Sequence, residues 1–87
     1  MKEITYFMLK YCPYCKKAEK WLNELMEEHP EYRQIPITTI DERKQSAIAN
    51  RYDYYLVPTF YVDGVKLHEG VASKDKVEYV LKAALRN

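Results

Sequence analysis

The chain has 87 residues, of which 14 are basic and 13 acidic, so its formal net charge at pH 7 is +1. This length predicts one domain over residues 1–87, and the near-neutral charge excludes a strong field for nucleic acid or an anionic membrane. The first residues carry charges too closely spaced for a signal peptide, and no segment approaches the roughly 20 apolar residues of a membrane helix. We therefore expect a cytoplasmic monomer that binds neither nucleic acid nor membranes, in a compartment where thiols stay reduced.

The N-terminal third predicts a strand followed by a helix. Residues 3–9, EITYFML, form a nearly continuous apolar and β-branched run, which is typical of a buried strand in a parallel sheet. Pro13 suits the first turn of a helix and His29-Pro30 should end it, so we predict a helix over about residues 13–28. Apolar residues at helical spacing define its inward face: Ala18, Trp21, Leu22, Leu25 and Met26.

The middle of the chain predicts a second strand and a second helix. Residues 34–40, QIPITTI, suit a strand whose start is irregular or lies at a sheet edge because of Pro36. Asp41 can cap the helix that follows, in which Ala47, Ile48 and Tyr52 should face inward.

The C-terminal third predicts a hairpin and a last helix. Residues 59–62, TFYV, form a third strand, and Asp63-Gly64 is a strong turn signal that pairs residues 65–68 back onto it. Ser73 should cap the last helix, whose apolar stripe is Val77, Val80, Leu81 and Ala84. The order is β-α-β-α-β-β-α, which predicts an α/β fold with a four-stranded mixed sheet flanked by three helices.

Both cysteines, Cys12 and Cys15, lie where the first strand meets the first helix. A bridge between them would close too short a loop to stabilise the fold much, so a structural disulfide explains them poorly. At a helix N-terminus the partial positive charge stabilises a thiolate, and three basic residues add to it: Lys10, Lys16 and Lys17. We therefore predict that Cys12 is the nucleophile of thiol–disulfide exchange and that Cys15, one helical turn on, is the resolving thiol.

A zinc site is the main alternative for this cysteine pair. Its other ligands would have to be His29 and His68, which match no compact spacing, and His29 should lie roughly 20 Å from Cys12 along the helix. Because Cys-x-x-Cys beside a βαβ pattern is a thioredoxin-like signature, the redox interpretation is favoured and no metal is expected.

The sequence resembles the thioredoxin superfamily, and CPYC at residues 12–15 resembles the active site of dithiol glutaredoxins. Residues 56–60, LVPTF, resemble the cis-proline loop of that family, with Val57-Pro58 as the cis bond. The resemblance implies a thioredoxin fold and an enzyme that reduces protein or glutathione mixed disulfides, with no bound cofactor and glutathione as the reductant. It also implies that Tyr14 contacts the bound group and that the Val57 backbone pairs with an extended substrate peptide or with glutathione.

Other segments depart from the glutaredoxin pattern. HEGVASKDKVEYVL has one glycine, Gly70, and no acid before Asp75 to hold the ammonium of glutathione, whose carboxylate could still use the helix start at Ser73. The resemblance assigns Lys10 to the glycyl carboxylate of glutathione. We expect glutathione to reduce the protein less efficiently than a typical dithiol glutaredoxin, and an acid introduced by Ala72→Asp or Ser73→Asp to raise that rate.

The second half of the chain looks more like a thioredoxin. Thioredoxins carry a buried acid six positions before the first cysteine, where this chain has Tyr6, so that acid is missing. A flavoprotein reductase is therefore an alternative electron donor to glutathione. An iron–sulfur carrier with Cys12 of two subunits and two glutathiones is a further alternative, which the rigid Pro13 turn disfavours. Tyr54 and Tyr55 either wall a substrate groove or are ordinary packing and surface residues.

Overall fold

A computed structural model describes residues 1–86 of the chain. Over that range the chain forms a four-stranded mixed sheet and three α-helices, as the sequence predicts. Among the described residues, no helix is both long enough and apolar enough to cross a membrane. The elements in chain order are β1 (Ile4–Met8), α1 (Pro13–Glu28), the 3-10 helix η1 (Pro30–Gln34), β2 (Ile37–Asp41), α2 (Ser46–Ala49), β3 (Thr59–Val62), β4 (Val65–Glu69) and α3 (Lys74–Leu85).

The strands lie in the order β2-β1-β3-β4. β1 pairs with β2 in parallel, as a strand–helix–strand crossover requires, and β3 pairs antiparallel with both β1 and β4. The β3–β4 turn is Asp63-Gly64, with φ of 47° and 80°, which matches the two positive φ angles of a tight hairpin turn. Because β2 stands first in the strand order, it is an edge strand, which is one of the two placements that Pro36 favours.

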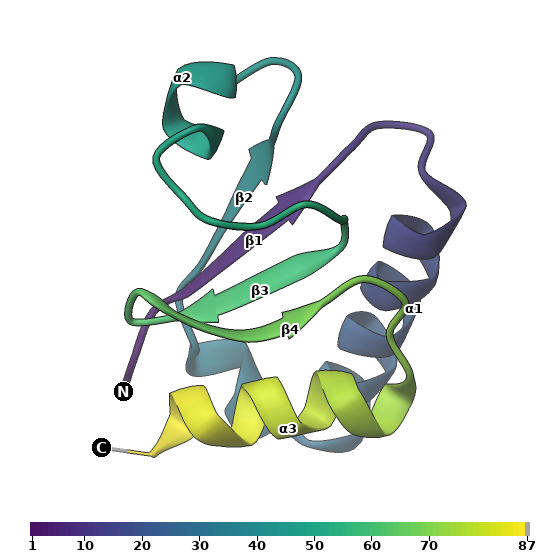
Figure 1. Cartoon of the computed structure of the whole chain (residues 1–87). Helices are drawn as coiled ribbons and strands as arrows, with labels where there is room; N and C mark the ends of the chain where they lie inside the picture. Colours follow the sequence, from purple (N-terminus) through teal and green to yellow (C-terminus); the bar gives the residue numbers. More distant parts are fainter. Residues whose placement is uncertain (87) are drawn as a thin grey trace.

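Helices α1 and α3 pack against one face of the sheet, and α3 runs across the lower end of the view in Figure 1. Side chains alternate along each strand, so Ile4 and Tyr6 of β1 and Phe60 and Val62 of β3 point to this face. Tyr6 stacks on Phe60 with ring centroids 4.8 Å apart. The predicted stripe of α3 is fully confirmed, since all four of its residues are buried. In α1, Ala18, Leu22 and Leu25 are buried, while Trp21 and Met26 are half-buried.

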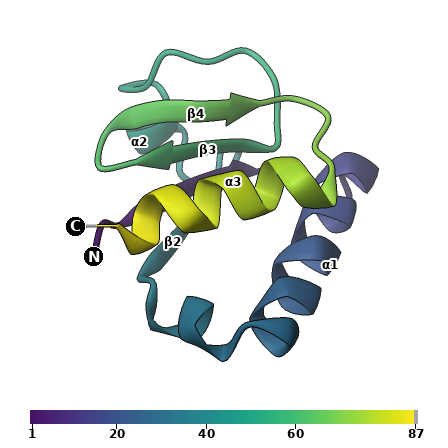
Figure 2. The ribbon, with the colours of Figure 1, turned by 90° about the horizontal axis from the view of Figure 1, so that it is seen from below.

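The opposite face of the sheet is covered by α2 and the segment after it, and in Figure 2 this segment runs on the side of β3 and β4 that lies away from α3. Its packing centres on an aromatic cluster, defined as Phe7, Tyr52, Tyr54 and Tyr61, with ring centroids 4.7 to 5.7 Å apart along its contacts. The Tyr61 hydroxyl donates to the Asp53 carbonyl at 2.7 Å, so the cluster has a satisfied polar edge.

In the middle of the chain the second strand is confirmed with a later start, and the predicted cap of the second helix is wrong. β2 begins at Ile37 because residues 30–34 form the 3-10 helix η1, which follows the predicted helix end at His29-Pro30. Asp41 does not cap α2: it ends β2, and its carboxylate accepts the N–H groups of Arg43 and Lys44 in a turn. That turn shortens α2 to one turn.

The inward face predicted for α2 is also wrong in part. Ala47 and Ile48 are exposed, whereas Ala49 is buried against the aromatic cluster. Tyr52 does face inward, but from the segment after the helix. A helix of one turn has no stripe, so the apolar spacing that suggested one has no meaning here.

Candidate active site

Cys12 is the N-cap residue of α1, as the sequence predicts. Its backbone is extended, with φ −80° and ψ 116°, and its Sγ accepts the backbone N–H of Cys15 at 3.3 Å. The described first turn of α1 contains no acidic residue, so the helix N-terminus presents its positive end to that sulfur unopposed. Tyr11, directly before it, has a φ of 70°, which is strained for a bulky side chain and sharpens the turn.

Cys15 lies behind Cys12 and is only 1% exposed, whereas Cys12 is half-buried, and both thiols are free. Burial raises the pKa of the Cys15 thiol, and the neighbouring Cys12 raises it further. Two groups act in the opposite direction and lower that pKa: the backbone of Leu9 and the side chain of Tyr6. The two sulfurs therefore differ in access, and the buried Cys15 thiol ionises less readily than an ordinary thiol because its pKa is raised.

The Val57-Pro58 peptide bond is cis, which confirms that prediction. In Figure 1 the segment leading into β3 turns at the end of the sheet that faces the first turn of α1. Pro58 is buried and Val57 is half-buried. Within residues 1–86 neither the N–H nor the C=O of Val57 takes part in a hydrogen bond, so both groups are available to a ligand.

Glu69 at the end of β4 braces the segment before this cis bond. Its carboxylate accepts the N–H groups of Tyr55 and Leu56, the latter at 2.9 Å, and the Lys66 ammonium at 2.7 Å. The hydrogen bond from Lys66 lowers the pKa of Glu69 most, and the two backbone N–H groups lower it further, to about 2. Gly70 continues the brace, because its N–H donates to the Pro58 carbonyl at 2.8 Å. Its φ is +89° and a Cβ at this position would lie 3.4 Å from Leu56 Cδ1, so glycine is the residue that fits there.

The link between β4 and α3 is occupied by structural roles. Ala72 is 8% exposed and belongs to the core under α1 and α3. The Ser73 hydroxyl accepts the N–H of Lys76 at 3.2 Å, which confirms Ser73 as the N-cap of α3. Ala72 is therefore a poor place for the acid that glutaredoxins use, which corrects one of the two substitutions suggested from the sequence.

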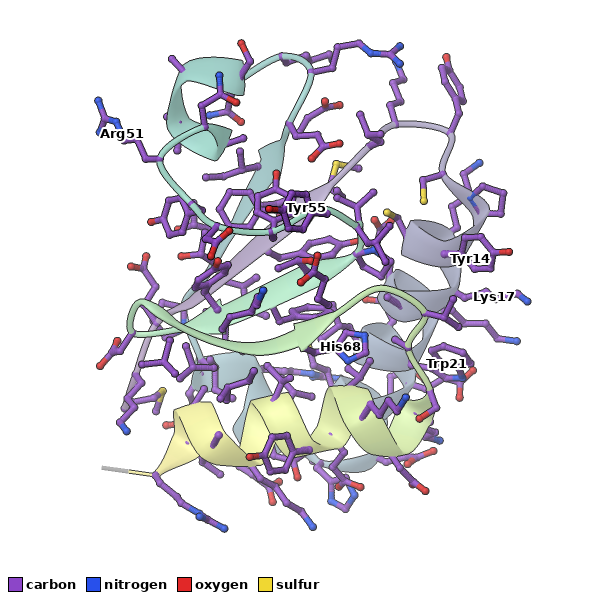
Figure 3. All side chains as sticks on the ribbon, in the orientation of Figure 1. Tyr14, Lys17, Trp21, Arg51, Tyr55 and His68 are labelled. Atoms are coloured by element: carbon purple, nitrogen blue, oxygen red, sulfur yellow. The ribbon has the colours of Figure 1, made fainter. Side chains whose placement is uncertain are left out.

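The tyrosines considered as walls of a substrate groove divide into two kinds. Tyr14 is 51% exposed and points away from the body of the molecule in Figure 3, and Tyr55 is 90% exposed. Tyr54 instead packs on Phe7, and its hydroxyl donates to Glu42 at 2.7 Å. For Tyr54 the packing alternative is therefore correct. Lys10 lies two residues past the end of β1, with its Nζ 5.3 Å from the Tyr11 ring centroid.

One residue near the thiols was missed by the sequence interpretation. Glu19 lies one helical turn beyond Cys15, and the Tyr6 hydroxyl donates to its Oε2 at 2.8 Å. The i, i+4 spacing on α1 places Glu19 on the face of Cys15, and this spacing was the available signal. The position where thioredoxins have an acid thus holds a tyrosine that binds an acid from the neighbouring helix.

Within residues 1–86 the structure has no group of three His, Cys, Asp or Glu side chains placed to hold a metal ion. His29 lies beside Glu78, with His29 Nε2 3.6 Å from Glu78 Oε2. His68 Nε2 lies 2.8 Å from the Gly70 carbonyl. The two histidines considered as zinc ligands thus contact other groups.

A family model described as Glutaredoxin matches residues 4–67 of the chain. Among solved structures, a thioredoxin from Malassezia sympodialis aligns with a TM-score of 0.75 and 20% identity over 98% of this chain and 76% of that chain. The oxidised thioredoxin from Plasmodium falciparum aligns with a TM-score of 0.73 and 17% identity, over 98% of this chain and 82% of that one. A thioredoxin from Fasciola hepatica aligns with a TM-score of 0.69 and 17% identity, over 95% of this chain and 80% of that one.

No curated protein sequence matches this chain significantly. The similar structures establish the thioredoxin fold, and the family model covers most of the chain, including the cysteine pair and the cis-proline loop. The chain therefore belongs to the glutaredoxin family, with the paired cysteines of a thiol–disulfide oxidoreductase.

Proposed function

We propose that the protein reduces protein disulfides and glutathione mixed disulfides through Cys12 and Cys15, with glutathione as the reductant. The observation that carries this proposal is the asymmetry of the two thiols. Cys12 Sγ is accessible and accepts an N–H bond at a helix N-terminus, whereas Cys15 is buried directly behind it. Such a pair can divide the work between an attacking and a resolving sulfur.

In the first step, the Cys12 thiolate attacks one sulfur of the substrate disulfide, and the other sulfur leaves as a thiolate and takes up a proton. In the second step, Cys15 loses its proton and attacks Cys12 Sγ. The Cys12–Cys15 disulfide forms, and the second half of the substrate leaves as a thiol. The substrate has then gained two electrons from the dithiol, and two protons, which equal the proton that Cys12 released on ionising and the proton that Cys15 loses. Two glutathione molecules restore the dithiol and leave as glutathione disulfide.

Substrate docking is supported by the groups around the thiols. The unpaired N–H and C=O of Val57 can pair with an extended peptide as an added strand. Tyr14 in the first turn of α1, and Tyr55 and Leu56 ahead of the cis bond, expose apolar surface, and Leu56 is 61% exposed. An apolar rim of this kind suits a protein disulfide whose flanking residues are presented in extended form.

The choice of electron donor rests on the β4–α3 link. Ala72 is buried and Ser73 caps α3, so neither supplies an acid to the ammonium of glutathione. The backbone N–H groups at the start of α3 are still able to receive a carboxylate of glutathione. This mixture favours a working but weakened glutathione site, and it is the reason to keep a flavoprotein reductase as the second candidate donor.

The donor is tested by oxidising the protein and following its re-reduction in two parallel assays. One contains glutathione, glutathione reductase and NADPH, and the other contains a thioredoxin reductase and NADPH. The proposal predicts NADPH consumption in the first assay, with an insulin or glutathionylated-peptide substrate. Consumption in the second assay alone would replace glutathione by a flavoprotein donor, and consumption in neither, with an unreactive Cys12, would overturn the function itself. Cys15→Ser serves as the control, since it should accumulate the mixed disulfide, which mass spectrometry detects.

A further inference from the structure

The turn that leads into Cys12 borders a small cavity. The Cys12 N–H donates to the Leu9 carbonyl at 3.2 Å, so Lys10 and Tyr11 are the two central residues of this turn. Both line a cavity of about 130 Å³, together with Leu9 and with three residues at the end of β2 and just after it, Asp41, Arg43 and Lys44. Because Tyr11 adjoins Cys12 in sequence, the cavity lies close to the sulfur that attacks in the proposed function.

Positive charge is in excess around this cavity. Lys10, Arg43 and Lys44 are exposed, and within residues 1–86 none of these three side chains forms an ion pair. Among the described lining residues the one acid is Asp41, whose carboxylate accepts the N–H groups of Arg43 at 2.9 Å and Lys44 at 3.3 Å. Three positive charges thus stand against one carboxylate that is already hydrogen-bonded.

Glu42, which precedes Arg43 in sequence, has a different partner. Its carboxylate accepts the Tyr54 hydroxyl at 2.7 Å, and it lines the neighbouring cavity, which Tyr54 also borders. The formal net charge of the whole chain is only +1, so the surplus of positive charge is a local property of the two turns. Such a surplus attracts anionic groups of a partner and repels cationic ones.

A protein substrate brings its own side chains to this place. During the proposed attack its cysteine sulfur meets Cys12 Sγ, while its backbone pairs in extended form with Val57. An extended chain advances roughly 3.3 Å per residue, so side chains one to three residues from that cysteine lie roughly 3 to 10 Å from it along the chain. Lys10 is two residues from Cys12, which is at most about 7.6 Å between their Cα atoms. The cavity is therefore within reach of side chains that flank the substrate cysteine.

We propose that the cavity lined by Lys10, Arg43 and Lys44 receives a carboxylate side chain of the substrate protein, so that disulfides flanked by acidic residues are preferred. This inference rests on the thiol–disulfide exchange proposed above and specifies its substrate class. Charges at the rim of an interface act mainly on the rate of association and on the choice of partner. Because the resemblance also assigns Lys10 to glutathione, the test changes Arg43 and Lys44.

The experiment measures single-turnover reduction of three peptide disulfides, so no electron donor is needed. Each substrate is a disulfide-linked dimer of a short peptide with one cysteine, flanked on both sides by glutamate, glutamine or lysine. Reduced protein is mixed with excess substrate and quenched with acid, and chromatography of the released peptide gives a second-order rate constant. Wild type is compared with Arg43→Gln/Lys44→Gln and with the charge reversal Arg43→Glu/Lys44→Glu. The matched control, Arg33→Gln/Lys82→Gln, removes the same charge from exposed residues of η1 and α3.

At low salt, wild type should reduce the glutamate substrate about three- to tenfold faster than the glutamine substrate and the lysine substrate slowest, since exposed charge pairs are individually weak. Raising NaCl from about 0.02 M to about 0.5 M should remove most of this difference, because salt screens exposed charges. Arg43→Gln/Lys44→Gln should reduce the glutamate and glutamine substrates equally, at the wild-type rate for glutamine. The charge reversal should favour the lysine substrate, a gain that damage to the fold does not produce. The control should keep the wild-type preference.

Equal wild-type rates for the three substrates would overturn the inference, as would a preference that survives in Arg43→Gln/Lys44→Gln. Loss of the preference in the control variant as well would assign it to net charge rather than to this cavity. If Arg43→Gln/Lys44→Gln kept the preference but glutathione re-reduced it more slowly, the cavity would serve glutathione instead. Equal peptide rates with inhibition by a single-stranded oligonucleotide would assign the cavity to phosphate. The proposed function itself would be refuted only if no peptide were released and Cys12 were unreactive.

Discussion

The N-termini of α1 and α3 are built alike, and the proposed function uses them differently. At each, an extended N-cap residue accepts the N–H of the residue three positions on: Cys12 Sγ from Cys15 at 3.3 Å, and Ser73 Oγ from Lys76 at 3.2 Å. Both sites satisfy one of the unpaired N–H groups that every helix start exposes. At α1, however, the capping atom is a thiol sulfur, and in the proposed function this sulfur is also the attacking group.

The surroundings of the two caps explain the division. Lys74 is the first residue of α3. Its Nζ lies 2.6 Å from Glu28 Oε2 and 3.3 Å from Glu24 Oε1, so two ion pairs hold the start of α3 against α1. The start of α1 has no such tie among the described residues, and exposed aromatic side chains flank it. The start of α1 is therefore the more open of the two, whereas the start of α3 is held against α1 by ion pairs.

The largest predicted effect is the loss of activity in Cys12→Ser, which tests whether the α1 cap has a role beyond stabilising its helix. Serine is a favoured N-cap, so the free energy of unfolding should change by less than about 0.5 kcal/mol, while disulfide reduction should become undetectable because a hydroxyl does not replace the thiolate. Thermal unfolding and insulin reduction measure the two quantities. Ser73→Cys in the Cys12→Ser background is the converse control. Activity in that double variant would show that any N-cap thiol suffices, without a resolving cysteine behind it.

The next largest effect concerns Ala72, the residue before the α3 cap. Because Ala72 is 8% exposed and packed in the core, Ala72→Asp should lower the free energy of unfolding by at least about 2 kcal/mol, the usual penalty for burying an unpaired polar group. Urea unfolding at neutral pH measures it. Ala72→Ser, which adds a smaller polar group, should cost less. Full stability of Ala72→Asp would mean that this link opens to solvent and would restore position 72 as a candidate for glutathione contact.

Replacement of the cap itself should have a smaller effect and should sharpen the donor question. Ser73→Ala removes the capping oxygen and should cost about 1 kcal/mol, whereas Ser73→Asp keeps a good cap and should be close to neutral for stability. The new carboxylate should also bind the ammonium of glutathione and raise the glutathione-dependent rate up to about tenfold. Reaction with dithiothreitol is the control and should not change. A flat glutathione rate in Ser73→Asp would favour the flavoprotein donor.

Local signals in the sequence were sufficient for most of the fold and for the dithiol. Pro13 and His29-Pro30 bound a helix by removing backbone donors, and Asp63-Gly64 determines a turn, so these elements follow from a few residues. Prediction failed at α2, where the turn at Asp41 uses side-chain bonds to the backbone and leaves room for one helical turn only. Such competition between capping a helix and making a turn cannot be decided from residue types alone.

The candidate site shows the same limit. Cys12 and Cys15 could be placed because their function depends on spacing along one helix. The pairing of Tyr6 with Glu19 joins a strand to a helix, and the bracing of residues 55 and 56 by Glu69 joins two segments that are not neighbours in sequence. These contacts depend on how the strand and helix pack together, which the periodicity of either element does not specify.

The smallest predicted effect concerns Glu69, which lies four residues before the α3 cap and braces residues 55 and 56 ahead of the cis bond. Hydrogen bonds from Lys66 and from the Tyr55 and Leu56 N–H groups lower the pKa of Glu69 from 4.5 to about 2. A carboxyl whose pKa is depressed on folding stabilises the fold fully above its ordinary pKa. That contribution is lost as pH falls from about 4.5 towards 2.

Glu69→Gln should therefore give a shallower fall in stability over this range than wild type, with the two curves parallel above it. Thermal unfolding followed by circular dichroism, from about pH 6 down to pH 2, measures the difference between the curves. Glu27→Gln, which changes an exposed acid of α1, should follow the wild-type curve. Parallel curves for wild type and Glu69→Gln down to the lowest pH would mean that the carboxylate does not brace the cis-proline segment. The two helix starts would then differ only in their caps and ion pairs.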